Sequence, residues 1–172
     1  MAEVSPGDPA AWHLVMVGDH ETDSALGCYN EIAELRTDLG LTGRVTFTGF
    51  VSDDELAAFY NAASLLVLPS FDEGFGLPVV EAMASGRPVA VSNRGSLPAL
   101  VGDVGLLFDP EDRTSITHTI TRLLKEPALR HELGARGVAR AAGNSRRGRC
   151  SGGSRVPTRL RRSAWGRPSA TI

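Results

Sequence analysis

The chain has 172 residues, of which 42% are hydrophobic and 22% are charged, a composition typical of one ordinary soluble domain rather than two. No stretch approaches the roughly 20 apolar residues of a membrane-spanning helix, and residues 1–11 lack the basic and then apolar order of a signal peptide, so we expect a cytoplasmic protein. The net charge of −2 excludes a uniformly basic chain, and Cys28 and Cys150 lie too far apart to suggest a disulfide framework or a zinc site.

Apolar runs of strand length alternate with segments of helical periodicity, which predicts β/α units around a parallel sheet. We therefore expect the α/β fold class, with a Rossmann-like parallel sheet and helices on both of its faces. The predicted strands are 13–17, 44–48, 65–68, 88–91 and 105–108, and the predicted helices are 24–39, 52–62, 78–86, 96–101, 113–125 and 128–141. Ser52 and Glu55 form a capping box at the start of the second helix, and Pro78 suits the first turn of the third.

The last 30 residues differ in composition from the rest of the chain. Residues 1–142 contain all 20 acidic residues and carry a net charge of −10, whereas residues 143–172 contain eight arginines and no acidic residue. This Gly, Ser, Arg and Pro-rich segment cannot bury enough apolar surface to offset its ordering entropy. We therefore place the domain at 1–142 and expect 143–172 to be a disordered or non-native tail. Nucleic-acid binding is not expected; it would rest on this tail alone, and removing the tail tests it.

The loop after the third predicted strand carries the strongest chemical signal. Glu73 and Glu81 flank a segment that contains Gly74 and Gly76. The glycines let the backbone approach a ligand closely, and the start of the following helix offers unpaired N–H groups and a positive dipole end suited to phosphate. We expect Glu81 in the first turn of that helix, as a carboxylate that accepts hydrogen bonds from a vicinal diol such as ribose. Glu73, on the loop, could do the same for sugar hydroxyls.

The segment EGFGLPVVEAMA (73–84) resembles the E-x7-E motif of the retaining GT-B glycosyltransferases of family 4, also called group 1. The resemblance extends over about residues 12–142, through GRVTFTGFV (43–51), ASLLVLPS (63–70), GRPVAVS (86–92), LPALVG (97–102) and LFDP (107–110). It implies that Glu73 is the catalytic carboxylate and holds hydroxyls of the donor sugar, and that Glu81 holds the nucleotide ribose. It also implies contacts of the backbone at Gly74, Phe75, Gly76 and Leu77 with the sugar and diphosphate, and of Phe50 and Val51 with the nucleobase.

The family pattern contains parts that this sequence lacks. The C-terminal half usually opens with a strand and a helix that bear an Arg and a Lys for the diphosphate, and an acceptor-binding domain precedes that half; residues before Trp12 match neither. The resemblance is therefore to a truncated C-terminal donor-binding domain. The intact enzyme would transfer a hexose from a nucleotide-diphosphate sugar to an acceptor hydroxyl with retention, without a metal or cofactor.

Such a transfer needs the donor clamped between two domains, so we expect the chain alone to be inactive and to bind its donor weakly at most. The missing partner strands would expose a sheet edge and an apolar patch, which favours self-association.

Two alternatives stay open at this stage. A nicotinamide-binding or flavodoxin-like domain shares the expected sheet, but Val17 and Gly18 lead into Asp19 and His20 rather than a GxGxxG turn. A non-catalytic nucleotide-sugar-binding module, or a degenerate fragment, is the other alternative.

Several further residues weigh little at this stage. Gly18 could contact phosphate or base, or belong to an ordinary turn. Met83 is expected in helix packing. Asp72, His118 and His131 are expected at the surface, whereas Ser92 and Arg94, after the fourth predicted strand, could face the cleft.

Overall fold

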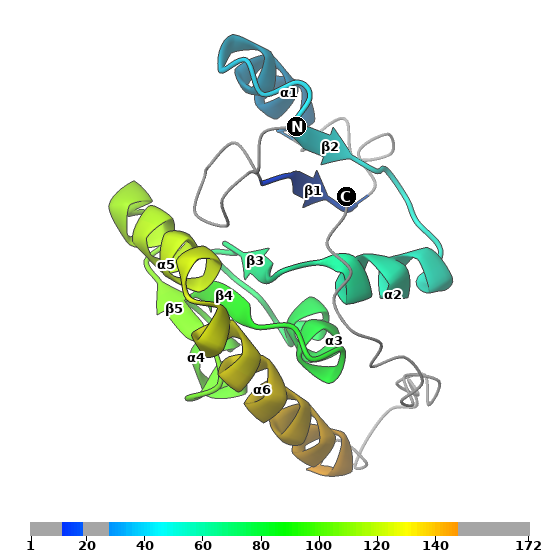
Figure 1. Cartoon of the computed structure of the whole chain (residues 1–172), viewed down its shortest axis with the longest axis vertical. Helices are drawn as coiled ribbons and strands as arrows, with labels where there is room; N and C mark the ends of the chain where they lie inside the picture. The colour runs from blue at the N-terminus through cyan, green and yellow to red at the C-terminus, as the bar shows by residue number, and fades with distance from the viewer. Residues whose placement is uncertain (1–11, 19–27, 148–172) are drawn as a thin grey trace.

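The computed structural model describes residues 12–18 and 28–147 of the chain (Figure 1). Strands and helices alternate as predicted. The strands are β1 (Leu14–Met16), β2 (Val45–Phe47), β3 (Leu66–Leu68), β4 (Val89–Ser92) and β5 (Leu106–Phe108). The helices are α1 (Tyr29–Asp38), α2 (Asp53–Ala62), α3 (Leu77–Ala84), α4 (Leu97–Val101), α5 (Arg113–Lys125) and α6 (Pro127–Arg147).

Local sequence signals account for several of these boundaries. The predicted capping box at α2 is confirmed: the Ser52 side chain accepts from the Glu55 amide, while the Glu55 carboxylate accepts from the Ser52 amide at 2.8 Å. Helix α5 spans the predicted residues, and the Asp112 side chain caps it by accepting from the amide of Thr114. These contacts satisfy amides that have no partner inside the helix.

The last helix is longer than predicted, and part of the first predicted helix lies outside the described residues. Helix α6 continues to Arg147, so residues 143–147, which we assigned to the tail, are helical. The change in composition at Gly143 does not end the helix, because one interior glycine costs only about 1 kcal/mol while each further residue adds a hydrogen bond. Residues 148–172 lie outside the described part of the chain, as do residues 24–27 of the first predicted helix.

The parallel sheet is divided into two hydrogen-bonded groups. Strand β1 pairs with β2, and β3, β4 and β5 form a second group in that order, all in parallel. Figure 1 draws β1 between β2 and the three-stranded group. In this position Leu14 is 51% exposed and Val15 is 38% exposed. The prediction of parallel β/α architecture is confirmed, but within the described residues its strands do not form one continuous ladder.

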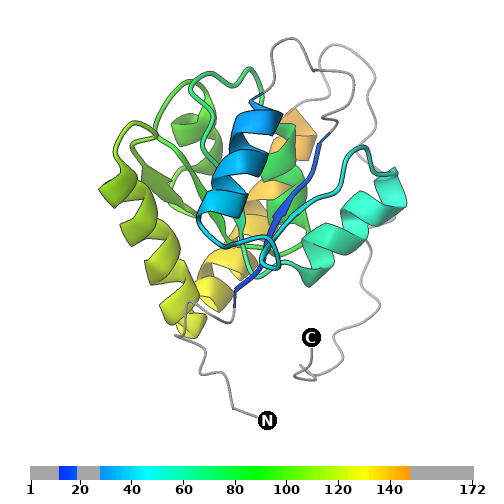
Figure 2. The same cartoon turned by 90° about the horizontal axis from the view of Figure 1, so that it is seen from above.

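Helices cover both faces of the three-stranded group, as the alternating side chains of β4 demonstrate. Val89 and Val91 join a buried cluster with residues of α3 and α4, whereas Ala90, on the opposite face, joins Phe108 and residues of α5 and α6. Adjacent strand residues point to opposite faces, so these two clusters lie on the two sides of the sheet. Figure 2 shows the outer helices α2 and α5 at opposite sides of the molecule.

The core is concentrated in the part of the chain from α3 onward. Among the described residues, Val45 is the sole buried residue that precedes Gly76. Met83 is fully buried, which confirms its expected packing role. Helix α6 lies close to α3 because it presents glycines there: a Cβ at Gly134 would collide with the Gly86 carbonyl, and one at Gly137 would lie 3.4 Å from Met83 Cγ.

Candidate functional site

The candidate site lies where the strands end. The loop from Pro69 to Gly76 follows β3, and the neighbouring β4 ends in the turn that contains Arg94, Gly95 and Ser96. Ligands of open parallel sheets bind at the carboxyl ends of the strands, where these loops gather. The loop that carries Glu73 and the turn before α4 are therefore the parts of the fold that the site is built from.

Gly76 begins helix α3 and sets the shape of the loop. It is the N-cap residue, with φ 73° and ψ 43°, a left-handed conformation that favours glycine. A Cβ at Gly76 would also lie 2.7 Å from Leu100 Cδ2, so both conformation and space disfavour a larger residue. A Cβ at Gly74 would meet nothing within 4 Å, which leaves open space beside that part of the loop. The two glycines therefore serve different purposes.

Glu73 folds back onto its own loop. The Gly76 amide donates to Glu73 Oε1 at 3.3 Å, and the Ser96 hydroxyl donates to the Glu73 carbonyl oxygen at 2.8 Å. The predicted anion site at the start of α3 thus has one of its amides directed to the Glu73 carboxylate. Phe75 and Leu77, which flank Gly76, are 62% and 54% exposed.

The position of Glu81 corrects one expectation. Helix α3 begins at Leu77, so Glu81 is its fifth residue, and the first turn contains no acidic residue. Dipole stabilisation falls off beyond the first turn. Instead, a tyrosine from another helix holds the carboxylate: Tyr60 Oη, on α2, donates to Glu81 Oε2 at 3.1 Å.

This pair perturbs the tyrosine strongly. Burial, the negative charge of Glu81 and the hydrogen bond together hold the pKa of Tyr60 far above its usual range. Tyr60 therefore keeps its proton, and donates to Glu81, at pH values where an ordinary tyrosine loses it. Glu81 keeps acceptor capacity on Oε1, since a carboxylate offers lone pairs on both oxygens.

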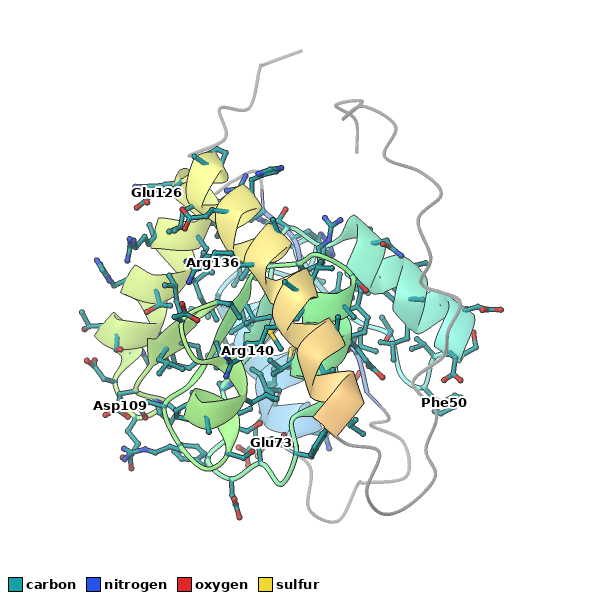
Figure 3. The ribbon with its side chains drawn as sticks, turned by 90° about the horizontal axis from the view of Figure 1, so that it is seen from below. Phe50, Glu73, Asp109, Glu126, Arg136 and Arg140 are labelled. Atoms are coloured by element: carbon teal, nitrogen blue, oxygen red, sulfur yellow. The ribbon has the colours of Figure 1, made fainter. Side chains whose placement is uncertain are left out.

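The remaining predicted donor contacts form a separate group. Gly18 and Gly49 form an isolated antiparallel bridge, in which the Gly18 amide donates to the Gly49 carbonyl at 3.4 Å. Phe50 follows directly and is 83% exposed, while Val51 is partly buried. Figure 3 shows Phe50 well separated from Glu73. The structure thus brings Gly18 close to Phe50, and Glu73 close to Gly76, but does not join the two groups. Asp19 and His20 lie outside the described residues.

The other residues given little weight in the sequence contact groups within the protein or lie at its surface. Ser92 is buried and accepts from the Arg94 amide at 3.1 Å, and Arg94 pairs at the surface with Asp109 at 3.2 Å and Glu111 at 2.8 Å. Asp72, His118 and His131 are exposed, as expected. Within residues 12–18 and 28–147, no three His, Cys, Asp or Glu side chains gather as a metal site, and no helix is long and apolar enough to cross a bilayer.

Tyr60, Gly95 and Ser96 were missed by sequence reasoning. The apolar face of the helix predicted at 52–62 could have drawn attention to Tyr60, because a tyrosine packed on a core usually finds a partner for its hydroxyl. The sequence offers no means of choosing Glu81, 21 residues away, as that partner. The contact of Ser96 with Glu73 likewise depends on which strand lies beside β3.

Comparisons with known proteins find relatives of this chain. Residues 1–126 match the family described as glycosyl transferases group 1. The chain is 46% identical to the O-antigen chain mannosyltransferase B of Escherichia coli over 99 residues, which are 58% of this chain and 26% of that protein. The chain thus spans about a quarter of the length of that relative.

Two solved structures share the fold. The C-terminal domain of a glycosyl transferase group 1 family protein (LpcC) from Francisella tularensis superposes with a TM-score of 0.70 at 28% identity, covering 79% of this chain and 71% of that domain. HepE from Anabaena, solved with UDP-glucose, gives a TM-score of 0.70 at 27% identity, covering 80% of this chain and 38% of HepE. The similarity to a C-terminal domain agrees with the expected place of these residues in a larger enzyme.

Proposed function

The chain belongs to the group 1 glycosyltransferases, and we propose that its described domain binds the nucleotide-sugar donor of a glycosyl transfer reaction. The observation that carries this proposal is the pair of glutamates around the start of α3. Glu73 lies on the loop against the Gly76 amide, and Glu81 is held by Tyr60 one helical turn further on. The support from relatives is that HepE was solved with UDP-glucose.

Each residue has a separate role in the proposed complex. Glu81 accepts hydrogen bonds from the ribose diol, while Tyr60 fixes one of its oxygens. Glu73 accepts hydrogen bonds from hydroxyls of the sugar and is the catalytic carboxylate. The loop backbone from Gly74 to Leu77 lies along the diphosphate, whose charge suits the start of α3.

The nucleobase would lie against the second group of residues, at the ends of β1 and β2. Phe50 presents an exposed ring. Val51 follows it in the chain, and the bridge between Gly18 and Gly49 brings Gly18 close to it. A base needs a flat apolar contact, which an exposed aromatic side chain supplies. The separation of Phe50 from Glu73 suits an elongated donor whose base and sugar are at opposite ends.

The reaction proposed for the whole enzyme is transfer of a hexose with retention. The bond between the anomeric carbon and the diphosphate oxygen breaks, the oxygen of the acceptor hydroxyl bonds to the same face of the sugar, and the proton of that hydroxyl leaves with the nucleoside diphosphate. Both substrates must be oriented together for this step, so donor-binding residues supply only half of the arrangement. We therefore expect this chain to bind donor without turning it over. Its alternative role is non-catalytic nucleotide-sugar binding, and a degenerate fragment would bind nothing.

Ligand-observed NMR tests the proposal. Saturation transfer to UDP-, GDP- and ADP-sugars is measured for the folded original chain and for Glu81→Ala. Glu34→Ala, a matched change at an exposed position of α1, is the control. We expect transfer to the ribose and base protons of one nucleotide class, and at least tenfold weaker binding in Glu81→Ala, since hydrogen bonds to a charged group contribute about 1.5–3 kcal/mol. No transfer from any donor in a folded sample would contradict donor binding. Release of the nucleoside diphosphate with an acceptor present would contradict the expected lack of turnover.

A further inference from the structure

The turn between β4 and α4 touches the backbone of Glu73 directly. Ser96 Oγ donates to the Glu73 carbonyl oxygen at 2.8 Å, across 23 residues of sequence. Serine at the N-cap of a helix normally accepts a hydrogen bond from an amide of the first turn. Ser96 is the N-cap residue of α4, yet its side chain makes no capping hydrogen bond. Helix capping therefore does not explain this serine, whereas the contact with Glu73 does.

Gly95 brings the same turn close to Glu73. Its φ of +58° is in the left-handed region. A Cβ at this position would lie 3.3 Å from the Glu73 nitrogen and 3.4 Å from the Glu73 oxygen. Any larger residue would therefore press on the backbone of Glu73 in addition to straining its own. The hydrogen bond from Ser96 is thus possible only because the turn runs directly against the loop.

Helix α4 also supports the other end of the loop. A Cβ at Gly76 would lie 2.7 Å from Leu100 Cδ2 and 3.1 Å from Leu97 Cδ2, so the Gly76 backbone packs on two side chains of α4. The end of α4 is in turn fixed by α6: the Arg140 guanidinium donates to the carbonyls of Leu100 at 2.6 Å and of Ala99 at 2.7 Å. Figure 3 shows Arg140 on α6, between Arg136 and Glu73 in that view. The loop therefore rests on a helix that is itself held at its far end.

We propose that Ser96 is a positioning residue for Glu73: through the Glu73 carbonyl it sets the direction of the carboxylate that binds the donor sugar. This inference rests on the proposed function. The hydrogen bond from the Gly76 amide to Glu73 Oε1 is long, at 3.3 Å, and belongs to the same short loop. It cannot fix the loop relative to the sheet, whereas Ser96 connects the loop to β4 and α4. Ser96 acts through Glu73 and not by contact with the donor.

A positioning role for Ser96 and a general loss of stability predict different effects on ligand binding. Glu73 contacts the sugar, whereas Glu81, on α3, contacts the ribose, so loss of the Ser96 hydroxyl should weaken binding of the sugar-bearing donor more than binding of the nucleoside diphosphate, which the loop backbone also contacts. The comparison uses UDP-glucose and UDP, or GDP-mannose and GDP, according to which nucleotide class binds. We expect Ser96→Ala to weaken binding of the nucleotide sugar about fivefold, the loss of one neutral hydrogen bond, and to weaken binding of the nucleoside diphosphate by about twofold at most. Ser96→Thr, which keeps the hydroxyl, should restore affinity.

A second measurement needs no ligand. Hydrogen exchange and chemical shift of the Gly76 amide are recorded by NMR for the full chain, for Ser96→Ala, for Ser96→Thr and for Ser64→Ala, a control at an exposed serine before β3. We expect Ser96→Ala alone to shift this amide and to speed its exchange about fivefold. Gly95→Ala perturbs the same contact independently and should shift the amide too, because its Cβ would press on the Glu73 backbone.

The outcomes separate the two proposals. If the Gly76 amide does not respond to Ser96→Ala, Ser96 does not position the loop, and the inference is overturned whatever the ligand data say. If the amide responds but both ligands weaken equally, the role is merely structural, and the inference is again overturned. If the intact chain binds neither ligand, donor binding and the proposed effect on sugar affinity both fail; the Gly76 measurement then decides separately whether Ser96 holds the loop.

Discussion

The hydrogen bond between Tyr60 and Glu81 joins α2 to α3 and can be removed with little other change. Tyr60→Phe deletes the hydroxyl that donates to Glu81 Oε2 at 3.1 Å. It keeps the ring, which packs against the buried cluster around Val79 and Met83. Any loss of stability can therefore be assigned to the hydrogen bond rather than to a cavity.

The size of the effect follows from the charge and exposure of the pair. A hydrogen bond to a charged group contributes about 1.5–3 kcal/mol, but Tyr60 and Glu81 are only partly buried, so solvent screening reduces this to about 1 kcal/mol. For a domain of this size, a loss of 1 kcal/mol lowers the melting temperature by about 2–4 °C.

The same pair predicts a dependence on pH. Because the folded pKa of Tyr60 is raised, the folded state keeps this proton where the unfolded state, with a pKa of about 10, loses it. The contribution to stability is complete below pH of about 10 and is lost as the pH rises toward the folded pKa. The difference in unfolding free energy between the original chain and Tyr60→Phe should therefore shrink above pH of about 10.

Urea denaturation of Tyr60→Phe, Glu81→Met and the double variant measures the coupling, since methionine keeps the length of the side chain without the acceptor oxygen. We expect Glu81→Met to remove most of the effect of Tyr60→Phe. Single effects that add to within about 0.5 kcal/mol would refute the argument, because they would show that the two side chains do not stabilise the fold together. A pH dependence of stability that is identical in the original chain and Tyr60→Phe would refute the raised pKa of Tyr60.

Two further predictions concern α2 and β1. The hydrogen bonds from Ser52 lower the pKa of Glu55, so the capping box should stabilise the chain above the unfolded pKa of about 4.3 and lose this contribution as the pH falls further. Glu55→Gln should flatten the acid dependence of urea unfolding, and an unchanged dependence would contradict a role for the ionised carboxylate. The exposed apolar side chains of β1 should drive self-association, seen as a molar mass that rises with concentration in light scattering and falls in Val15→Lys. A constant monomeric mass would rule this out.

The sequence by itself determined the local features of this protein. The alternation of apolar runs and helical periods gave the order of the elements, since each depends on neighbours a few residues away. The Ser52 and Glu55 capping box and the glycine at the start of α3 are likewise local devices. The position of Glu73 and Glu81 around one helix start also follows from chain order alone, although the exact first residue of α3 decided that Glu81 lies beyond the first turn.

The tertiary structure decided everything that depends on contacts between distant segments. Tyr60 meets Glu81, Ser96 meets Glu73, and Arg140 holds α4 only because β3 pairs with β4 and α6 packs on α3 through its glycines. The division of the strands into two groups depends on which edges hydrogen-bond, and apolar composition does not specify that. Periodicity records which face of an element is buried but not what covers it, so the residues that orient the two glutamates could be found only in the folded chain.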